Sequence, residues 1–452
     1  MTTVPPIQVG KLNDELTRHM DVVLRCTAES KKYRRLLLAT PPENRYPYFY
    51  PRDTSCAVQT LSRIAISDAG YSSASLAFDL IRDAAHFLKD VQAEDGSWGQ
   101  RYSLDGEPRG IYIQEDNVAH GIAVIANYLL VAKERSQTVP QQDEFLAAID
   151  RGLAVAFDRY YEKEIGLFRS TTSIHESSIE SGYTCWVNHA YHHAGHLATR
   201  VGREIDHGHV ISRSHLAFRE QFVHSVSELF LHGDKILRRF DPEGNPDLRP
   251  DITLLSPFYF GFVPHPDVQR RAVEFIEKQL WDPELGMIMR YLPFGRDNSI
   301  HVHAGNGPWT QYTAILAQYW YSVGETERGD DLLDRIDQHR NDQGEIPEHL
   351  STVRRFENFM QTEWQTGRDA AKEFDGSILI PGLPFDRILE ETNNMARSYA
   401  DTAKRCAKRD GSAPEGGTIA FAAPLMWSHA EVMRALLVKA DDWWPLRGGH
   451  EA

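Results

Sequence analysis

A short turn that contains glycine and an aromatic or aliphatic residue recurs along the chain, and it constrains the fold more than any other feature. Five copies are DGSW at Asp95, EIGLF at Glu164, HGDKIL at His232, ELGMI at Glu284 and QGEIP at Gln343. The stretch YPYFYPRD, residues 46–53, lies where the first member of the series is expected. The turns are spaced by roughly 50 to 70 residues, which is long enough for a helix pair and its loops. The sequence therefore predicts six helical hairpins.

The segments between these turns have the periodicity of α-helices, and almost none alternates like a strand. Many are apolar over more than one face, as expected for a helix with neighbours on both sides. The expected helices are 54–69, 73–92, 115–134, 143–161, 182–200, 267–281, 309–324, 327–340 and 424–440. We expect an all-α protein whose six hairpins close into an (α/α)6 toroid, with the connecting loops around one funnel. An open helical array is the alternative.

The segment from about Leu350 to Glu415 breaks this rhythm, because two charged helical stretches delay the final helix. We interpret it as a helical insertion at about 350–415, serving as a lid or an oligomer contact. The rest of the chain, which is 41% hydrophobic, can build one large core. The prediction is therefore a single catalytic domain over residues 1–452.

Composition limits the partners and the compartment. A net charge of −15 argues against nucleic acid and against an anionic membrane, because their phosphate groups would repel the chain. The four cysteines (Cys26, Cys56, Cys185 and Cys406) are far apart, which indicates thiols in a reducing compartment. The N-terminus shows no secretory signal, and no apolar stretch is long enough to cross a bilayer. We expect a cytoplasmic protein; its oligomeric state is not indicated.

The stretch YPYFYPRD places rigid aromatic surface beside Arg52 and Asp53. Such a combination suits a sugar, which stacks on aromatic rings and bridges charged groups through its hydroxyls. If the turns surround one mouth, polar residues of the other turns join this site. The further candidates are Tyr48, Gln114, Asp116, Glu176, Glu180, Arg290, Tyr291, Trp309 and Glu348. Trp98 of DGSW is either a stacking platform or a hairpin wedge, and we count it as a platform.

Two carboxylates across an aromatic funnel are what glycoside hydrolysis requires. One stays protonated and donates to the leaving oxygen, while the other stays ionised. A gap of roughly 6.5–9.5 Å admits a water and inverts the anomer, whereas at roughly 5–5.5 Å the second carboxylate becomes a nucleophile. The glycine-bearing turn and Pro347 before Glu348 favour that residue over a solvated surface glutamate.

Five stretches follow one another in a familiar order from about Tyr46 to Leu437. They are YPYFYPRD, QRYSLDGEPRGIYIQED, the segment from DITLLSPFYFGF to GMIMRY, NDQGEIPEH and APLMWSHAEVMRAL. Together they resemble glycoside hydrolase family fifteen, the glucoamylase-like inverting α-glucosidases. Each motif is weak alone, but five in order are fairly specific.

The resemblance implies a role for each matching residue. Arg52 and Asp53 would bind the hydroxyls of the non-reducing glucose, and Gln114, Asp116 and Arg290 would line the same subsite. Glu348 would be the general base, and Tyr48 would hold or deprotonate the water. Because two carboxylates suffice for this chemistry, we expect neither a metal nor an organic cofactor.

The general acid is where the chain departs from the family. The family usually has Trp-Glu after the Gly-Leu-aromatic turn, whereas here that turn reads GLFRS. Counting back from the TCW helix places Glu176 at the acid position, with His175 replacing the tryptophan, and Glu180 is the second choice. For the base, Glu415 in SAPEGG is the second choice after Glu348.

The helix NHAYHHAGHLA carries His189, His192, His193 and His196 on one face at a metal-like spacing. It has no HExxH glutamate, so we expect hydrogen bonds to loops and no metal.

The sequence thus predicts an exo-acting, anomer-inverting α-glucoside hydrolase for small α-glucosides or gluco-oligosaccharides. One alternative is a toroid with another sugar reaction, a trehalase-type hydrolase or a sugar epimerase that uses histidines. The other is a catalytically silent homologue that binds carbohydrate and regulates a partner.

Overall fold

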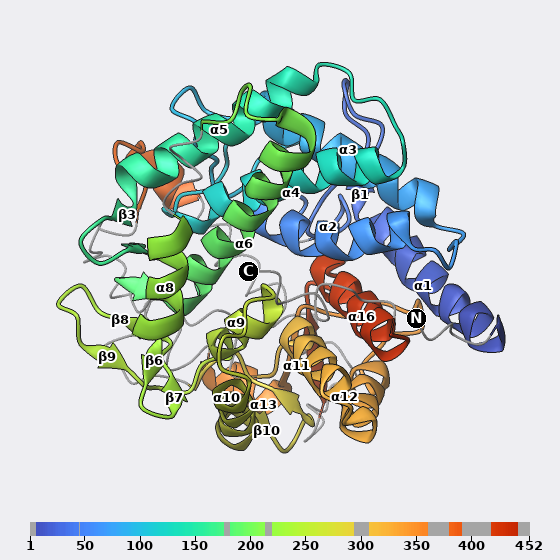
Figure 1. Ribbon diagram of the computed structural model, residues 1–452. Helices are drawn as coiled ribbons and strands as arrows, with labels where there is room; N and C mark the ends of the chain where they lie inside the picture. Colours follow the sequence, from blue (N-terminus) through green and yellow to red (C-terminus); the bar gives the residue numbers. More distant parts are fainter. Residues whose placement is uncertain are drawn as a thin grey trace.

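Helices form two concentric layers in the computed structural model, which describes residues 6–44, 46–175, 181–212, 219–292, 307–359, 379–390 and 417–441. The inner layer surrounds the centre of Figure 1, and each inner helix packs on the next until the last returns to the first. In this order the inner elements are α2 (Pro51–Ile66), α4 (Asp116–Glu134), α6 (Cys185–Val201), α9 (Ser256–Tyr259) with the preceding 3-10 helix η3 (Ile252–Leu255), α11 (Thr310–Ser322) and α16 (Met426–Lys439). The chain is an all-α protein with the expected (α/α)6 toroid.

The outer helices each pack beside an inner helix and lie at the periphery of Figure 1. They are α1 (Pro6–Arg25), α3 (Ala74–Val91), α5 (Gln142–Arg159), α8 (Arg219–Leu229), α10 (Pro266–Leu280) and α12 (Thr326–Gln338). Burial separates the layers. Almost every residue of α11 is buried, whereas α12 buries only Gly329, Leu332 and Ile336, one narrow stripe. A helix that is apolar all round must have neighbours on all sides, so the sequence pattern itself sorts inner from outer helices.

The repeated turns follow the outer helices. Three are antiparallel hairpins: β3 (Tyr161–Glu162) with β4 (Leu167–Phe168), β6 (Leu231–His232) with β7 (Lys235–Ile236), and β10 (Trp281–Asp282) with β11 (Met287–Ile288). Glycine recurs because these turns need a left-handed residue, with φ of 76° at Gly166 and 69° at Gly286. One assignment was wrong. The copy after α1 is the hairpin of β1 (Thr27–Ala28) with β2 (Leu36–Leu37), and YPYFYPRD is the segment that then leads into α2.

The nine expected helices are confirmed, with ends shifted by a few residues. Helices α1, α8 and α9 were not expected. The inner element at α9 is only eight residues long together with η3, too short for a periodic signal.

Three smaller elements complete the rim. The strands β5 (Tyr183–Thr184), β8 (Arg239–Phe240) and β9 (Pro246–Asp247) form a sheet, and a π-helix, η2 (Gly202–Asp206), extends α6.

The strands β12 (His349–Thr352) and β13 (Thr418–Phe421) pair with each other. The segment between them, where the insertion is predicted, begins with α13 (Val353–Phe359). Within the insertion, residues 379–390 dock on the loop before α4, where the Ile380 amide donates to the Ile111 carbonyl at 2.9 Å. Within the described residues, no helix is both long and apolar enough to span a bilayer.

Candidate functional site

The inner helices begin at the same end of the ring, which we call the mouth. Each brings a polar or aromatic residue to its first turn or its N-cap. These residues are Arg52 of α2, Asp116 of α4, Trp186 of α6, Asp251 as the N-cap of η3, Trp309 as the N-cap of α11, and Trp427 of α16. The loops that enter these helices are those that follow the outer helices. The fold therefore converts six distant sequence positions into one ring of side chains.

A buried ion pair joins α2 to α4. Arg52 donates from Nε to Asp116 Oδ2 at 2.9 Å and from Nη2 to Oδ1 at 3.1 Å, and Trp186 Nε1 donates to the same carboxylate at 3.1 Å. Burial would raise the pKa of Asp116, but the charges of Arg52 and His120 outweigh burial and lower it. Asp116 is therefore an anion that fixes the direction of Arg52.

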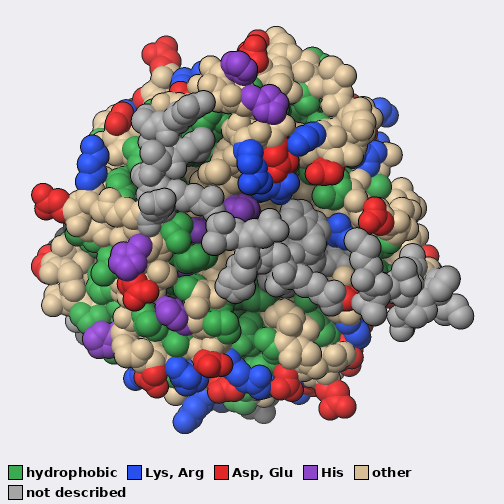
Figure 2. Space-filling model, in the orientation of Figure 1, with side chains coloured by type: hydrophobic (Ala, Val, Ile, Leu, Met, Phe, Trp, Pro, Cys, Tyr) green, Lys and Arg blue, Asp and Glu red, His purple; other side chains and the backbone are tan. Residues whose placement is uncertain are grey.

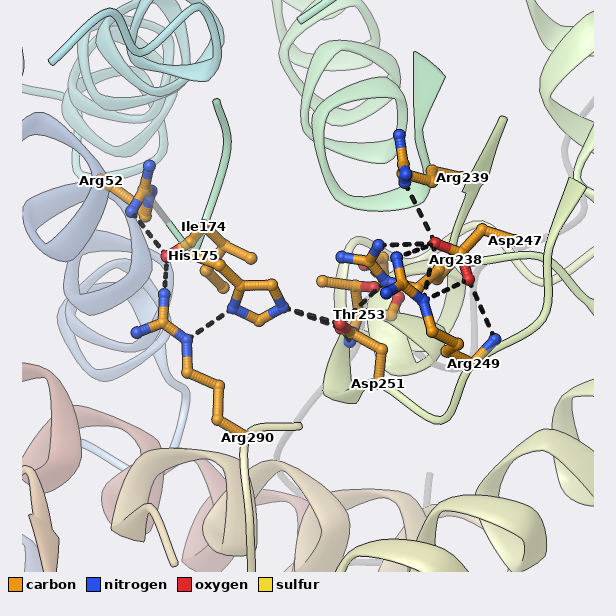
Figure 3. A network of polar contacts seen from close by, with 11 residues as sticks. Arg52, Ile174, His175, Arg238, Arg239, Asp247, Arg249, Asp251, Thr253 and Arg290 are labelled. Carbon is orange, nitrogen blue, oxygen red and sulfur yellow. Dashed lines mark hydrogen bonds and ion pairs between the residues drawn. The ribbon is translucent and has the colours of Figure 1, made fainter. Parts of the chain in front are cut away.

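Two arginines hold the loop at residues 173–175 from opposite sides (Figure 3). Arg52 Nη2 donates to the Ser173 carbonyl at 3.0 Å and Nη1 to the Ile174 carbonyl at 3.5 Å. Arg290 donates from Nη2 to the Ile174 carbonyl and from Nε to His175 Nδ1, the latter at 2.6 Å. The loop thus reaches the mouth already fixed by its backbone.

The other side of His175 faces a buried aspartate. His175 Nε2 lies 2.8 Å from Asp251 Oδ2, and Asp251 also accepts from Arg238 Nε at 2.9 Å and from the Thr253 amide at 2.8 Å. Although burial opposes it, the pKa of Asp251 is lowered, because His175, Arg238 and the Thr253 amide all stabilise the carboxylate. The network continues to Asp247, which pairs with Arg238 (Figure 3).

Glu348 lies beside an aromatic stack. The guanidinium of Arg290 is 4.7 Å from the ring centre of Trp309, which stacks on His349 at 4.4 Å, and His349 stacks on Phe421 at 4.4 Å. The Glu348 amide donates to the Phe421 carbonyl at 3.0 Å, and its carbonyl accepts from the Thr310 amide at 3.0 Å. Its carboxylate is 3.4 Å from His349 Nδ1, and the side chain is 17% exposed. The backbone is therefore fixed while the carboxylate keeps access to solvent.

Tyr312 lies beside Trp309, with the two ring centres 6.0 Å apart. It is buried in the first turn of α11, and burial raises the pKa of its hydroxyl. The charges of Arg290 and Arg52 oppose this rise, whereas that of Glu348 adds to it. The Arg290 guanidinium over Trp309 therefore lies one ring away from this phenol.

Most other expected residues also lie around this mouth. Tyr48 is half-buried, with its ring 5.1 Å from the Arg101 guanidinium, and Tyr291 packs edge-on against His175 at 4.8 Å. Asp53 is half-buried in the first turn of α2. Gln114 is buried and accepts from Asn117 at 3.2 Å, while its amide nitrogen has no hydrogen-bond partner among the described residues. A buried donor of this kind suits a ligand hydroxyl or a water.

The structure does not bring Trp98 into this group. Its indole is 3% exposed and donates to the Leu88 carbonyl at 2.9 Å. A Cβ added at Gly121 or Gly152 would meet this ring at 2.6 or 2.9 Å. The ring thus packs between α4 and α5, as the wedge interpretation requires, and we leave it out of the proposed site.

Three of the candidate carboxylates, Glu176, Glu180 and Glu415, lie outside the described residues. Their assignments stay predictions. The last described residue before Glu176 is His175.

Sequence reasoning missed Glu115, between Gln114 and Asp116. It is 4% exposed and accepts from the Thr171 amide at 2.7 Å, and its second oxygen has no hydrogen-bond partner in the part of the chain that the structure describes. Burial raises the pKa of this carboxyl to about 7. Its position beside two named candidates was the available signal.

Of the histidines of α6, His189 bonds within its own helix. His189 Nδ1 lies 2.8 Å from the Cys185 carbonyl, and burial lowers the pKa of His189 to about 4 and that of His193 to about 3. No group of three or more His, Cys, Asp or Glu side chains in the described ranges is arranged to hold a metal ion.

An open hollow of about 550 Å³ lies elsewhere, over β8 and β9, and its lining includes Arg239, Asp247 and Arg249. Asp247 pairs with both arginines. Figure 2 shows the charged side chains dispersed over this face of the protein rather than gathered in one patch. Because the charges of its lining are paired with one another, we do not assign the hollow to the site.

No family model and no curated protein matches the chain. Solved structures do. A wild-type glycosidase is 14% identical with a TM-score of 0.59, over 97% of this chain and 100% of that one. A glucoamylase from Saccharomycopsis fibuligera is 14% identical with a TM-score of 0.57, over 96% of each chain. A bacterial glucoamylase in complex with acarbose is 13% identical with a TM-score of 0.62, over 97% of this chain and 57% of that one. At such identities the likeness shows a glucoamylase-like fold.

Proposed function

We propose that the chain is a glycoside hydrolase, and specifically an exo-acting, anomer-inverting α-glucosidase for small α-glucosides or gluco-oligosaccharides. The observation that carries the proposal is geometric: the Arg290 guanidinium lies 4.7 Å from the ring centre of Trp309, the N-cap of α11, and the next residue, Thr310, binds the Glu348 carbonyl at 3.0 Å. Two forked cations beside a partly exposed carboxylate suit a neutral, polyhydroxylated substrate.

Each residue then has a part in the reaction. Glu348 would act as general base on a water, helped by Tyr48, and Glu176 would donate a proton to the leaving oxygen, with Glu180 as its alternative. Glu415 remains the alternative base. Substrate hydroxyls would be bound by Arg52, Asp53, Gln114, Arg290, Tyr291 and Trp309, and Asp116, which the sequence also places in this subsite, would act by holding Arg52 in place.

A base of this kind needs a fixed backbone and an accessible carboxylate, because it must reach a water that the substrate also contacts. Glu348 has both properties. We extend the proposal to the compartment: a cytoplasmic enzyme would meet oligosaccharides that are imported or made inside the cell.

The experiment is to offer the purified protein a panel of α-linked disaccharides and glucosyl conjugates and to follow the first released sugar by proton NMR. A β-anomer that appears before mutarotation supports the proposal and names the linkage. An α-anomer would require a close nucleophile pair and would overturn inversion. No release from any compound would favour the binding or regulatory alternative.

A further inference from the structure

A continuous chain of hydrogen bonds crosses the mouth from α4 to η3, and Figure 3 shows its part from Arg52 to Asp251. It runs from Asp116 through Arg52 to the Ile174 carbonyl, and from there through Arg290 and His175 to Asp251. His175 is the only uncharged side chain in this series that both accepts and donates. The position of its protons therefore decides how Arg290 is joined to Asp251.

The neighbours of His175 determine its tautomer. Arg290 Nε–H is always a donor, so the Nδ1 atom 2.6 Å away must accept. The proton of a neutral imidazole then lies on Nε2, which faces the Asp251 oxygens at 2.8 and 3.0 Å. A second proton on Nδ1 would set two donors against each other. The geometry thus selects the neutral Nε2–H form.

Burial makes this arrangement rigid. His175 and Asp251 have no exposed surface, and Arg238 is 1% exposed. Asp251 also receives hydrogen bonds from Arg238 Nε and the Thr253 amide, so its position is independent of His175. Asp251 is therefore the fixed point from which the imidazole is oriented.

Arg290 transmits this orientation toward the proposed base. Its Nε is held by His175, and its guanidinium lies over Trp309, which stacks on His349, the residue after Glu348. Without an acceptor at Nδ1, the guanidinium would keep its charge and its bond to the Ile174 carbonyl, but it could rotate about that remaining bond.

We propose that Asp251 and His175 form a positioning pair, which sets the rotation of Arg290 and fixes the 173–175 backbone for sugar hydrolysis. This inference rests on the proposed function. It assigns a role to the histidine that stands where the resemblance expects a tryptophan. Neither residue needs to touch the substrate.

The first test does not depend on activity. The protein is labelled with ¹⁵N-histidine, and the signal of His175 among the twenty histidines is identified by its loss in His175→Asn. The expected spectrum at pH 7 is that of a neutral Nε2–H tautomer, which changes in Asp251→Asn. An imidazolium or an Nδ1–H tautomer would overturn the inference.

The second test uses two matched variants. In His175→Asn the amide oxygen lies where Nδ1 was and still accepts from Arg290, whereas His175→Gln reaches Asp251 but has no acceptor at that place. We expect kcat/KM on the best α-glucoside to fall about 10-fold in the first variant, which keeps the acceptor but loses the contact with Asp251, and about 100-fold in the second. The loss should be in kcat more than in KM, because a rotated guanidinium still meets the sugar but fits the transition state poorly.

His189→Asn is the control, since His189 is a buried histidine that bonds within α6. It should leave kcat/KM unchanged. A loss as large as that of His175→Gln would overturn the inference, because replacing any buried histidine would then lower activity. If the wild type is active and His175→Gln equals it, the positioning role fails alone. If the wild type releases no sugar from any compound, the proposed function fails, and the role in hydrolysis fails with it.

Discussion

Two glutamates of the same ring, Glu431 and Glu348, are held in opposite ways. Glu431 on α16 has no exposed surface and accepts from Tyr259 Oη at 2.6 Å, Trp427 Nε1 at 2.7 Å and Gln318 Nε2 at 2.8 Å. Glu348 is partly exposed, and the described residues give its carboxylate one close polar neighbour, His349. A carboxylate whose oxygens are saturated by donors is a structural element, whereas one with open oxygens can hold a water.

The comparison also shows that a carboxyl whose pKa is raised by burial need not be catalytic. Burial raises the pKa of Glu431, with Arg434 and its donors opposing. A raised pKa would by itself suggest a catalytic acid. The donors around Glu431 leave no place for a substrate, so geometry decides against that role.

The largest expected effect is on catalysis at Glu348. Glu348→Gln keeps the shape of the side chain but removes the base, so kcat should fall by about 100- to 10 000-fold. The thermal midpoint should be unchanged, because few contacts of this carboxylate contribute to folding. Initial rates with the best α-glucoside and a thermal melt measure both effects.

A matched control lies on the same turn. Glu345 pairs with Arg25 at 2.8 Å, and Glu345→Gln should retain the wild-type rate. Equal rates in the two variants would remove Glu348 from the mechanism.

The second prediction concerns Glu431. Glu431→Gln turns an NH₂ group toward donors that need an acceptor, so the free energy of unfolding should fall by roughly 2–4 kcal/mol. Urea unfolding measures this loss. Activity per folded molecule should stay within a few-fold; a fall as deep as that at Glu348 would break the distinction between the two glutamates.

Glu115 sharpens the comparison, because it lies near the mouth but is buried like Glu431. Its pKa is raised by burial to about 7, so the folded state binds this proton more tightly than the unfolded state. The stability that it contributes is full below pH 4.5 and is lost as the pH rises through 7. Between pH 5 and 8 the wild type should lose roughly 2–3 kcal/mol relative to Glu115→Gln. Urea midpoints at several pH values measure the difference, and parallel curves for the two proteins would contradict it.

The smallest effect is expected at Tyr259. Tyr259→Phe removes one donor to Glu431 without changing the ring. It should lower the free energy of unfolding by roughly 1–2 kcal/mol, as measured by urea unfolding. In the background of Glu431→Gln the same change should cost less, since the bond is already weakened. Purely additive losses in this double-mutant cycle would mean that the bond contributes nothing.

Much of the fold could be predicted from the sequence because its signals lie in short, continuous segments. Periodicity locates the long helices, and a glycine turn follows each outer helix except α1, whose hairpin has no glycine. The inner element at α9 escaped because eight residues with Pro257 among them give no usable period. Likewise, the wedge role of Trp98 depends on glycines of two other helices, which no local pattern reveals.

The site divides in the same way. Arg52, Gln114, Arg290 and Glu348 stand in short motifs, so they could be named from the chain alone. The partner of His175 could not, since Asp251 lies 76 residues further along and only tertiary structure joins them. The replacement of a tryptophan by histidine was visible, but its meaning was not.

The convergence of helix starts at the mouth has an electrostatic consequence. Five of these helices are 13 to 19 residues long, and each directs the positive end of its peptide dipoles toward the same space. This field favours anions there, and Asp116 occupies the first position of α4. Because the field arises from the backbone, no side-chain substitution removes it. The helix starts thus add a positive contribution at the mouth of an acidic protein, whichever side chains the loops carry.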